Sequence, residues 1–310
     1  MRRVLLVATG DTMAYLTDPP GVATGAQLLR GIADVPGVDV TVEDVMAEPS
    51  WDTSPATMLA IARRARSALV EGFDGVVVTH GVDTLEETAF LTELVVGQVR
   101  GAVVFTGGTA PFDEPGSDGP GNLVTAVIAA ADPAVDSTVV CFNGELHAAR
   151  WARLVTATAF ESDPVLGRVS RGSGVRLAAA PPRRTPDIDG VPETDVALVK
   201  TYPGMPASLL TAVTDAGARG VVLEGTGSGN VPVELFIPIS ELVEWGIPVV
   251  IASRASTPGM TSLAGKVGAI SAHGLSPVHA RIALMAALAT THATRKAVDS
   301  AREWFAHLLG

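Results

Sequence analysis

The sequence contains a single cysteine among 310 residues, which excludes an internal disulfide. Cys141 lies in an apolar run and is interpreted as a small core residue. Basic residues are also scarce, because 22 lysines and arginines face 33 acidic residues and leave a net charge of −11. Such a chain repels a phosphate backbone on average, so we expect no nucleic-acid partner.

Long apolar runs are missing as well. No segment approaches the roughly 20 apolar residues of a membrane span, and the apolar stretch after Arg2 and Arg3 is too short for a secretory signal. We therefore expect a cytoplasmic protein with no membrane contact. The histidines show no metal-ligand spacing, and residues 225–229 lack the lysine of a phosphate-binding loop. The sequence thus implies neither a metal nor a cofactor, and His80 is interpreted as a hydrogen-bonded turn residue.

Hydrophobic residues are plentiful, at 47% of the chain with a mean hydropathy of +0.34, and they fall into strand and helix patterns that alternate. Strands are predicted near residues 3–8, 38–42, 75–78, 102–105 and 137–142, and helices at 25–35, 55–71, 85–97 and 122–131. Short connections between them predict a parallel sheet covered on both faces. We expect an α/β fold: a Rossmann- or flavodoxin-like N-terminal domain over residues 1–180, a linker over 181–194, and a smaller C-terminal α/β domain over 195–310.

The central stretch of the N-terminal domain is THGVDTLEET, residues 79–88. It follows an apolar strand and opens a helix, and ligands of parallel α/β sheets bind at such turns. Thr84 and Glu87 have the spacing of a capping box, which predicts that they cap this helix. Capping does not account for Asp83, which is placed where the helix dipole stabilises an anion that can face a ligand.

Four motifs resemble those of the bacterial-type L-asparaginases and occur in the same order along the chain as in that family. They are ATGDT at residues 8–12, the stretch 79–88, DGPGNL at residues 118–123 and GSGN at residues 227–230. The resemblance covers nearly the whole chain and implies the asparaginase-like two-domain fold. It also implies hydrolysis of a side-chain amide on a small amino-acid-like substrate, in a homotetramer built from close dimers, or in a homodimer.

The resemblance assigns roles to individual residues. Thr12 matches the nucleophile, a weak one that a base must activate, and backbone N–H groups near Asp11 and Val82 are expected to stabilise the oxyanion. Asp83 matches the aspartate that binds the substrate amine and Ser50 the serine that binds its carboxylate, although either side chain could instead be a helix cap. The further substrate-binding positions are Trp51, Val82, Gly108 and Asn230, the last of which reaches a neighbouring subunit in the family.

The sequence departs from the family at the residues that move protons. Val82 stands where the family has a second threonine, and Leu154 stands at the place of its lysine. Asp11 replaces a glycine and Trp51 replaces a glutamine. The loop over residues 13–24 is a candidate lid, in which Tyr15 lies close to the place of the family tyrosine. Losing acid–base groups typically costs about 10²–10⁴ in rate, so efficient asparagine hydrolysis by the usual relay is not expected.

Three functions remain open on this sequence. The first is an amidohydrolase with Thr12 as nucleophile, an altered substrate or weak L-asparaginase activity, and an unusual active site with a degenerate triad. The second is a diverged enzyme that performs a non-hydrolytic step, or a protein that only binds a ligand. The third is a non-catalytic subunit that works by association.

Overall fold

The computed structural model describes residues 1–45, 48–185, 187–188, 190–255, 263–289 and 294–309. The chain divides into two compact units, Met1–Arg184 and Thr185–Gly310. The prediction of an α/β fold with a smaller C-terminal domain is confirmed.

The first unit is built on an eight-stranded sheet with the strand order β12-β11-β8-β7-β6-β5-β1-β4. The neighbours from β4 to β7 run parallel, whereas β8, β11 and β12 continue the sheet in antiparallel pairs. The strands are β1 (Arg2–Ala8), β4 (Val38–Asp44), β5 (Gly75–Thr79), β6 (Ala102–Thr106), β7 (Thr138–Phe142), β8 (Glu145–Ala148), β11 (Gly167–Ser170) and β12 (Gly174–Leu177).

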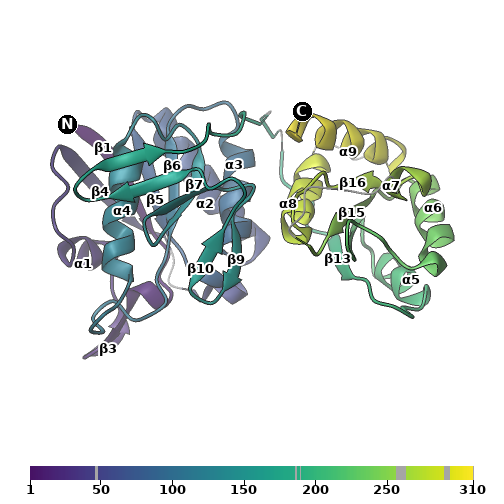
Figure 1. Cartoon of the computed structure of the whole chain (residues 1–310), viewed down its shortest axis with the longest axis horizontal. Helices are drawn as coiled ribbons and strands as arrows, with labels where there is room; N and C mark the ends of the chain where they lie inside the picture. Colours follow the sequence, from purple (N-terminus) through teal and green to yellow (C-terminus); the bar gives the residue numbers. More distant parts are fainter. Residues whose placement is uncertain (46–47, 186, 189, 256–262, 290–293, 310) are drawn as a thin grey trace. The chain divides into compact units, whose positions relative to one another are not determined.

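Helices cover both faces of this sheet (Figure 1). One face carries α1 (Gly25–Arg30) and α4 (Gly119–Ala131), and the other carries α2 (Pro55–Val70) and α3 (Leu85–Val96). In β1 the side chains of Val4 and Leu6 enter the first core, and those of Leu5 and Val7 enter the second. The strand therefore reads as a continuous apolar run because both of its faces are buried.

Two predictions of secondary structure in this unit are wrong. The helix predicted for residues 25–35 ends at Arg30, because Gly31 caps it and packs where a Cβ would overlap the ring of Phe112. The candidate lid is not an irregular loop. It contains a short 3-10 turn (Thr12–Ala14) and a hairpin of β2 (Tyr15–Thr17) and β3 (Pro20–Val22). A second small hairpin joins β9 (Arg153–Thr156) to β10 (Ala159–Glu161).

The second unit has a parallel four-stranded sheet in the order β13-β14-β15-β16. Its strands are β13 (Val196–Lys200), β14 (Gly220–Gly225), β15 (Val249–Ser253) and β16 (Ile270–Ser271). Its helices are α5 (Ser208–Asp215), α6 (Phe236–Glu244), α7 (Leu263–Lys266), α8 (Pro277–Ala287) and α9 (Thr294–Leu309). Over the described residues, no helix is long and apolar enough to cross a membrane.

Candidate functional site

The topology of the first unit places one end of β1 at a switch point. Strand β1 lies between β4 and β5, so the chain moves to one side of β1 to form β4 and then crosses to the other side to form β5. Register aligns the last residue of β1, Ala8, with Asp44 of β4 and with Thr79 of β5, which is itself aligned with Thr106 of β6. Ligands of open α/β sheets bind at such switch points, beyond the carboxyl ends of the strands. The motifs that follow these strands are therefore neighbours in space.

The turn after β1 presents Thr12 beside an acidic side chain. Thr9 fixes this turn to β5, because its hydroxyl donates to the carbonyl of Thr79 at 2.6 Å. Asp11 is 2% exposed, and its Oδ1 accepts the Thr12 N–H at 2.6 Å and the Thr12 hydroxyl at 3.1 Å. Thr12 itself is half-buried. One of the N–H groups expected to stabilise an oxyanion is therefore bonded to a carboxylate of the chain itself.

Asp11 adopts a backbone conformation that favours glycine, with φ 67° and ψ −170°. A non-glycine residue held in such a region costs about 1–3 kcal/mol, and residues of this kind cluster at functional sites. The Asp11 carboxylate also fits closely against Gly81, where a Cβ would overlap both that carboxylate and the Ser50 hydroxyl. The absence of a side chain at Gly81 makes the position of the Asp11 carboxylate possible.

Ser50 links Asp11 to Asp83. Its N–H donates to Asp11 Oδ2 at 2.5 Å, and its hydroxyl donates to Asp83 Oδ2 at 3.2 Å. Ser50 is 1% exposed, whereas Asp83 is exposed and is the middle residue of the 3-10 turn Val82–Thr84. A continuous chain of hydrogen bonds thus runs from Thr12 through Asp11 and Ser50 to Asp83.

The predicted capping box before α3 does not form. Thr84 is the residue at the cap position, but its side chain accepts no N–H of the helix. Its hydroxyl instead donates to the carbonyl of Ser50 at 2.7 Å. The sequence spacing is that of a cap, but tertiary structure offers this hydroxyl a partner from a distant loop. Thr84 therefore helps to hold the backbone of Ser50.

His80 is a buried turn residue. Its Nδ1 lies 2.8 Å from the carbonyl of Gly81 and its Nε2 lies 3.0 Å from the hydroxyl of Thr88. Burial lowers the pKa of His80, although the carbonyl of Gly81 and the charge of Asp11 oppose that shift. The neutral ring braces the turn after β5 from within.

The DGPGNL motif holds the turn after β6. The Asp118 carboxylate accepts the Thr109 N–H at 2.8 Å, and the Asn122 side chain donates to the carbonyl of Gly107 at 3.0 Å. Gly108 lies between these two and is buried. A Cβ at Gly108 would lie 3.2 Å from Met13, the residue after Thr12, so the turns after β1 and β6 pack directly together.

Val82 and Leu154 have joined an apolar cluster. Both are partly buried and pack against the core that lies between the sheet and the helices α2 and α3. The backbone N–H of Leu154 donates to Glu86 at 2.7 Å. Burial raises the pKa of the Glu86 carboxyl to about 7, and the nearby charge of Glu87 adds to this shift. The two positions that the resemblance assigns to the family's proton relay therefore hold side chains that pack against one hydrophobic surface.

The hairpin that carries Tyr15 is attached to the loop after β6. The carbonyl of Tyr15 accepts the Phe112 N–H at 2.9 Å. The Asp113 carboxylate accepts the N–H groups of Thr17 and Asp18. Burial, and after it the charge of Asp11, raises the pKa of the Tyr15 hydroxyl.

The other predicted substrate-binding residues differ in their surroundings. Trp51 follows Ser50 in a 3-10 turn and is 67% exposed. Asn230 belongs to the second unit, where its carbonyl accepts the Thr226 N–H at 2.8 Å in a tight loop after β14. Its side chain is exposed.

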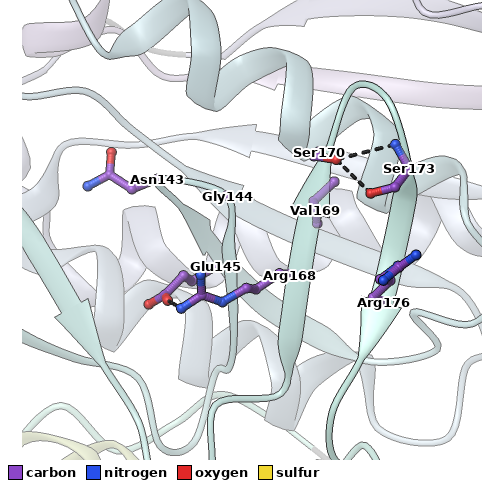
Figure 2. Close-up of a pocket in the computed structure, with 8 residues that line it drawn as sticks. All are labelled: Asn143, Gly144, Glu145, Arg168, Val169, Ser170, Ser173 and Arg176. Carbon is purple, nitrogen blue, oxygen red and sulfur yellow. Dashed lines mark hydrogen bonds and ion pairs between the residues drawn. The ribbon is translucent and has the colours of Figure 1, made fainter.

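A separate hollow of about 520 Å³ lies beside the outer strands β11 and β12 (Figure 2). Its lining includes Arg168, which is paired with Glu145, and Arg176, which lies opposite Arg168 in the strand register. None of the predicted site residues lines it. The predicted site at the switch point is therefore separate from this hollow.

Sequence reasoning treated Asp11 only as a departure from a glycine. In the structure the Asp11 carboxylate accepts two hydrogen bonds from Thr12 and one from Ser50. The sequence shows only that an acidic residue replaces a glycine directly before the predicted nucleophile. The importance of Asp11 becomes visible through its bond to Ser50, which is 39 residues away in the chain.

Comparison with known proteins matches both units to domains of one family. The family model "Asparaginase, N-terminal" matches residues 3–182, and "Glutaminase/Asparaginase C-terminal domain" matches residues 195–302. A probable L-asparaginase of Deinococcus radiodurans is 31% identical over 304 residues, which is 92% of each chain. A glutamyl-tRNA(Gln) amidotransferase subunit of Aeropyrum pernix is 30% identical over 279 residues, which is 81% of this chain and 65% of the Aeropyrum one.

Solved structures agree with the sequence relatives. The thermostable L-asparaginase from Thermococcus kodakarensis superposes with a TM-score of 0.88 at 26% identity, over 98% of this chain and 96% of that one. A probable cytoplasmic L-asparaginase from Campylobacter jejuni gives a TM-score of 0.83 at 26% identity, over 99% and 100% of the two chains.

Proposed function

The chain belongs to the asparaginase family and is an amidohydrolase, and from this premise we propose that Thr12 is its nucleophile, acting on the side-chain amide of a small amine-bearing substrate. The observation that carries the proposal is the chain of hydrogen bonds from Thr12 through Asp11 and Ser50 to Asp83 at the sheet's switch point. It brings the expected nucleophile and the expected amine-binding carboxylate into one polar cluster.

We further propose that free L-asparagine is a poor substrate. The resemblance assigns the substrate carboxylate to Ser50, but the N–H and the hydroxyl of Ser50 already donate to Asp11 and Asp83. No lysine or arginine side chain in the described ranges donates to either carboxylate. A substrate carboxylate would therefore have to displace a buried anion and face two negative charges. Like charges in one site disfavour each other strongly, so a substrate whose α-carboxyl group is masked is preferred.

Trp51 suits such a substrate. Its ring is largely exposed beside Ser50, and it replaces a polar amide of the family. A flat apolar side chain at the rim provides contact area for the group that masks the carboxylate. Val82 and Leu154, which the resemblance places in the family's proton relay, carry no group that transfers a proton, and this supports the proposal that asparagine is a poor substrate.

The test uses three amides and one matched pair of variants. Ammonia release is measured with L-asparagine, L-glutamine and L-asparagine methyl ester, and the mass of the peptide that contains Thr12 is measured after a rapid quench. We expect turnover of the methyl ester to exceed that of asparagine, and an acyl adduct on Thr12. Thr12→Val should abolish turnover, whereas Thr125→Val, the same change at a half-buried helical threonine, should not. Unchanged turnover in Thr12→Val would exclude Thr12 as nucleophile.

A second function is favoured by the match to an amidotransferase component. The relative from Aeropyrum pernix that bears this name is 30% identical to this chain. In that case the ammonia released at Thr12 would pass to an acceptor on a partner protein. The two functions separate in the assay above, since a hydrolase releases ammonia into solution without a partner.

We also propose a homo-oligomeric, cytoplasmic enzyme, either a homotetramer or a homodimer, in which Asn230 reaches the site of a neighbouring subunit. The family resemblance supports the assembly, and the name of the Campylobacter jejuni protein supports the location. Light scattering after gel filtration measures the assembly directly. Asn230→Ala should reduce turnover without changing the mass of the particle.

A further inference from the structure

We propose that Asp11 is the general base that activates Thr12 and then carries the proton to the leaving nitrogen. This proposal rests on the function proposed above, because it assumes that Thr12 is the nucleophile. A threonine hydroxyl needs a base at neutral pH. The positions from which the family supplies one are Val82 and Leu154, and neither side chain can accept a proton. The proton must therefore leave Thr12 by another route.

Asp11 provides the acceptor that geometry requires. Its Oδ1 lies 3.1 Å from the Thr12 hydroxyl oxygen, within the range in which a general base removes a proton directly. The hydroxyl is the donor in this contact, so the proton already points at the carboxylate. In the described part of the chain, Asp11 is the side chain to which the Thr12 hydroxyl is bonded.

The carboxylate is held in place from its other side. The Ser50 N–H binds Oδ2 at 2.5 Å and so directs Oδ1 at Thr12. At 2% exposure the group is shielded from water, which would otherwise compete for the proton. The backbone of Asp11 remains in a conformation that favours glycine. A chain that keeps an aspartate in such a conformation, where its relatives' motif has glycine, retains a strained residue for the sake of its side chain.

The proton and the bonds balance over the whole cycle. Oγ of Thr12 attacks the amide carbon while its proton moves to Asp11 Oδ1, and the carbonyl electron pair moves onto oxygen. The tetrahedral intermediate then collapses, the C–N bond breaks, and the proton on Asp11 passes to nitrogen, so ammonia leaves. Water attacks the resulting ester and gives its proton to Asp11, which returns it to Oγ of Thr12 as the C–O bond breaks. The products are a carboxylic acid, ammonia and the original enzyme.

The same step frees a donor for the oxyanion. In the resting state the Thr12 N–H is bonded to Oδ1 of Asp11 at 2.6 Å. Once Oδ1 has taken the proton, it is a neutral and weaker acceptor, since hydrogen bonds to ionised groups are roughly twice as strong as neutral ones. The Thr12 N–H is then available to the oxygen on which negative charge develops. Proton transfer and oxyanion binding are thereby coupled through one carboxylate oxygen.

The test compares Asp11→Asn with Asp52→Asn, the same change at an exposed aspartate in the turn next to Ser50. Asparagine keeps the shape of Asp11 but accepts no proton, so kcat/KM for L-asparagine methyl ester should fall about 10²–10⁴-fold. Asp52→Asn should keep wild-type values. Asp11→Gly leaves a space beside Thr12, and 100 mM formate, a carboxylate that fits this space, should raise the turnover of Asp11→Gly at least tenfold.

The possible outcomes distinguish the role proposed for Asp11 from the role proposed for Thr12. If the wild-type protein forms no acyl adduct on Thr12 with any of the three amides, the nucleophile is wrong and both proposals fail. If Thr12 is acylated but kcat/KM of Asp11→Asn is within about threefold of the wild-type value, only the role of Asp11 fails. If Asp11→Asn loses its near-UV circular dichroism, its low activity reports on folding and not on catalysis. The activity of Asp11→Gly with and without formate then tests the role of Asp11, and no gain from formate overturns the proposal.

Discussion

Glu86 makes the first unit less stable as the pH rises, and the size of the effect can be worked out. The carboxyl lies at the start of α3 and accepts the Leu154 N–H at 2.7 Å. Burial, with the charge of Glu87 adding to it, raises its pKa from 4.5 to about 7, against the opposing effects of the Leu154 N–H and Arg153. The protonated Glu86 carboxyl therefore contributes to the stability of the folded unit. This contribution is fully present below about pH 4.5 and is lost as the pH rises through about 7.

The loss amounts to about 3 kcal/mol, since each pKa unit corresponds to about 1.4 kcal/mol. Glu86→Gln removes the charge at every pH and keeps an oxygen that accepts the Leu154 N–H. We expect the variant to be more stable than the wild type by up to about 3 kcal/mol at pH 8.5 and by close to nothing at pH 4.5. For a unit of this size, about 2–4 °C per kcal/mol translates this into a rise in Tm of about 6–12 °C at pH 8.5.

The assay is thermal unfolding followed by near-UV circular dichroism at pH 4.5, 6.5 and 8.5, with the wild type and the variant in the same buffers. Glu114→Gln is the matched control, because this carboxylate is exposed in the loop after β6 and its loss should leave Tm unchanged within about 1 °C. A difference in Tm that is the same at all three pH values would refute the reasoning. So would a variant that is less stable than the wild type at pH 8.5.

Four further predictions test other parts of the structure. Val82→Thr combined with Leu154→Lys should raise ammonia release from L-asparagine at least tenfold if only the relay is missing, and no gain would mean that the pocket itself has diverged. Burial raises the pKa of Cys141 to about 12, so iodoacetamide should label it only after unfolding, and labelling of the native protein within minutes would contradict its burial. Asp113→Ala should release the hairpin of β2 and β3 and speed its limited proteolysis, with Glu114→Ala as the neighbouring control. Gly81→Ala should reduce turnover at least 100-fold while the sheet still forms, because the added methyl group displaces Asp11 and Ser50; wild-type activity in this variant would show that the cluster is not needed.

The sheet and its functional turns could be predicted from the sequence. The apolar runs before Thr9, His80 and Gly107 have the lengths and boundaries that are typical of buried parallel strands, and all three are strands. Parallel strands bring their carboxyl ends to one edge, so the meeting of the motifs followed from the pattern alone. Helix ends were predicted less well, because the end of α1 depends on Gly31 packing against a ring from a distant loop.

The hydrogen bonds within the site could not be predicted in the same way. Thr84 has the sequence of a cap but donates to a carbonyl 34 residues away, and no local pattern shows that choice. Asp11 looks like an isolated substitution until Ser50 is placed beside it. The hairpin at Tyr15 depends on Asp113, which lies almost a hundred residues further along the chain. Each of these contacts is decided by tertiary structure, and sequence spacing carries no trace of it.

The bonds of Ser50 also determine when the site can exist. They join segments that are 39 and 33 residues apart, and the three segments become neighbours only after β1, β4 and β5 have paired. Under the function proposed above, a nascent chain therefore cannot place Thr12 in this hydrogen-bonded cluster until the segments that carry Asp11, Ser50 and Asp83 have docked together. During refolding, recovery of activity should lag behind recovery of strand content, so that the enzyme stays silent while it is still incomplete.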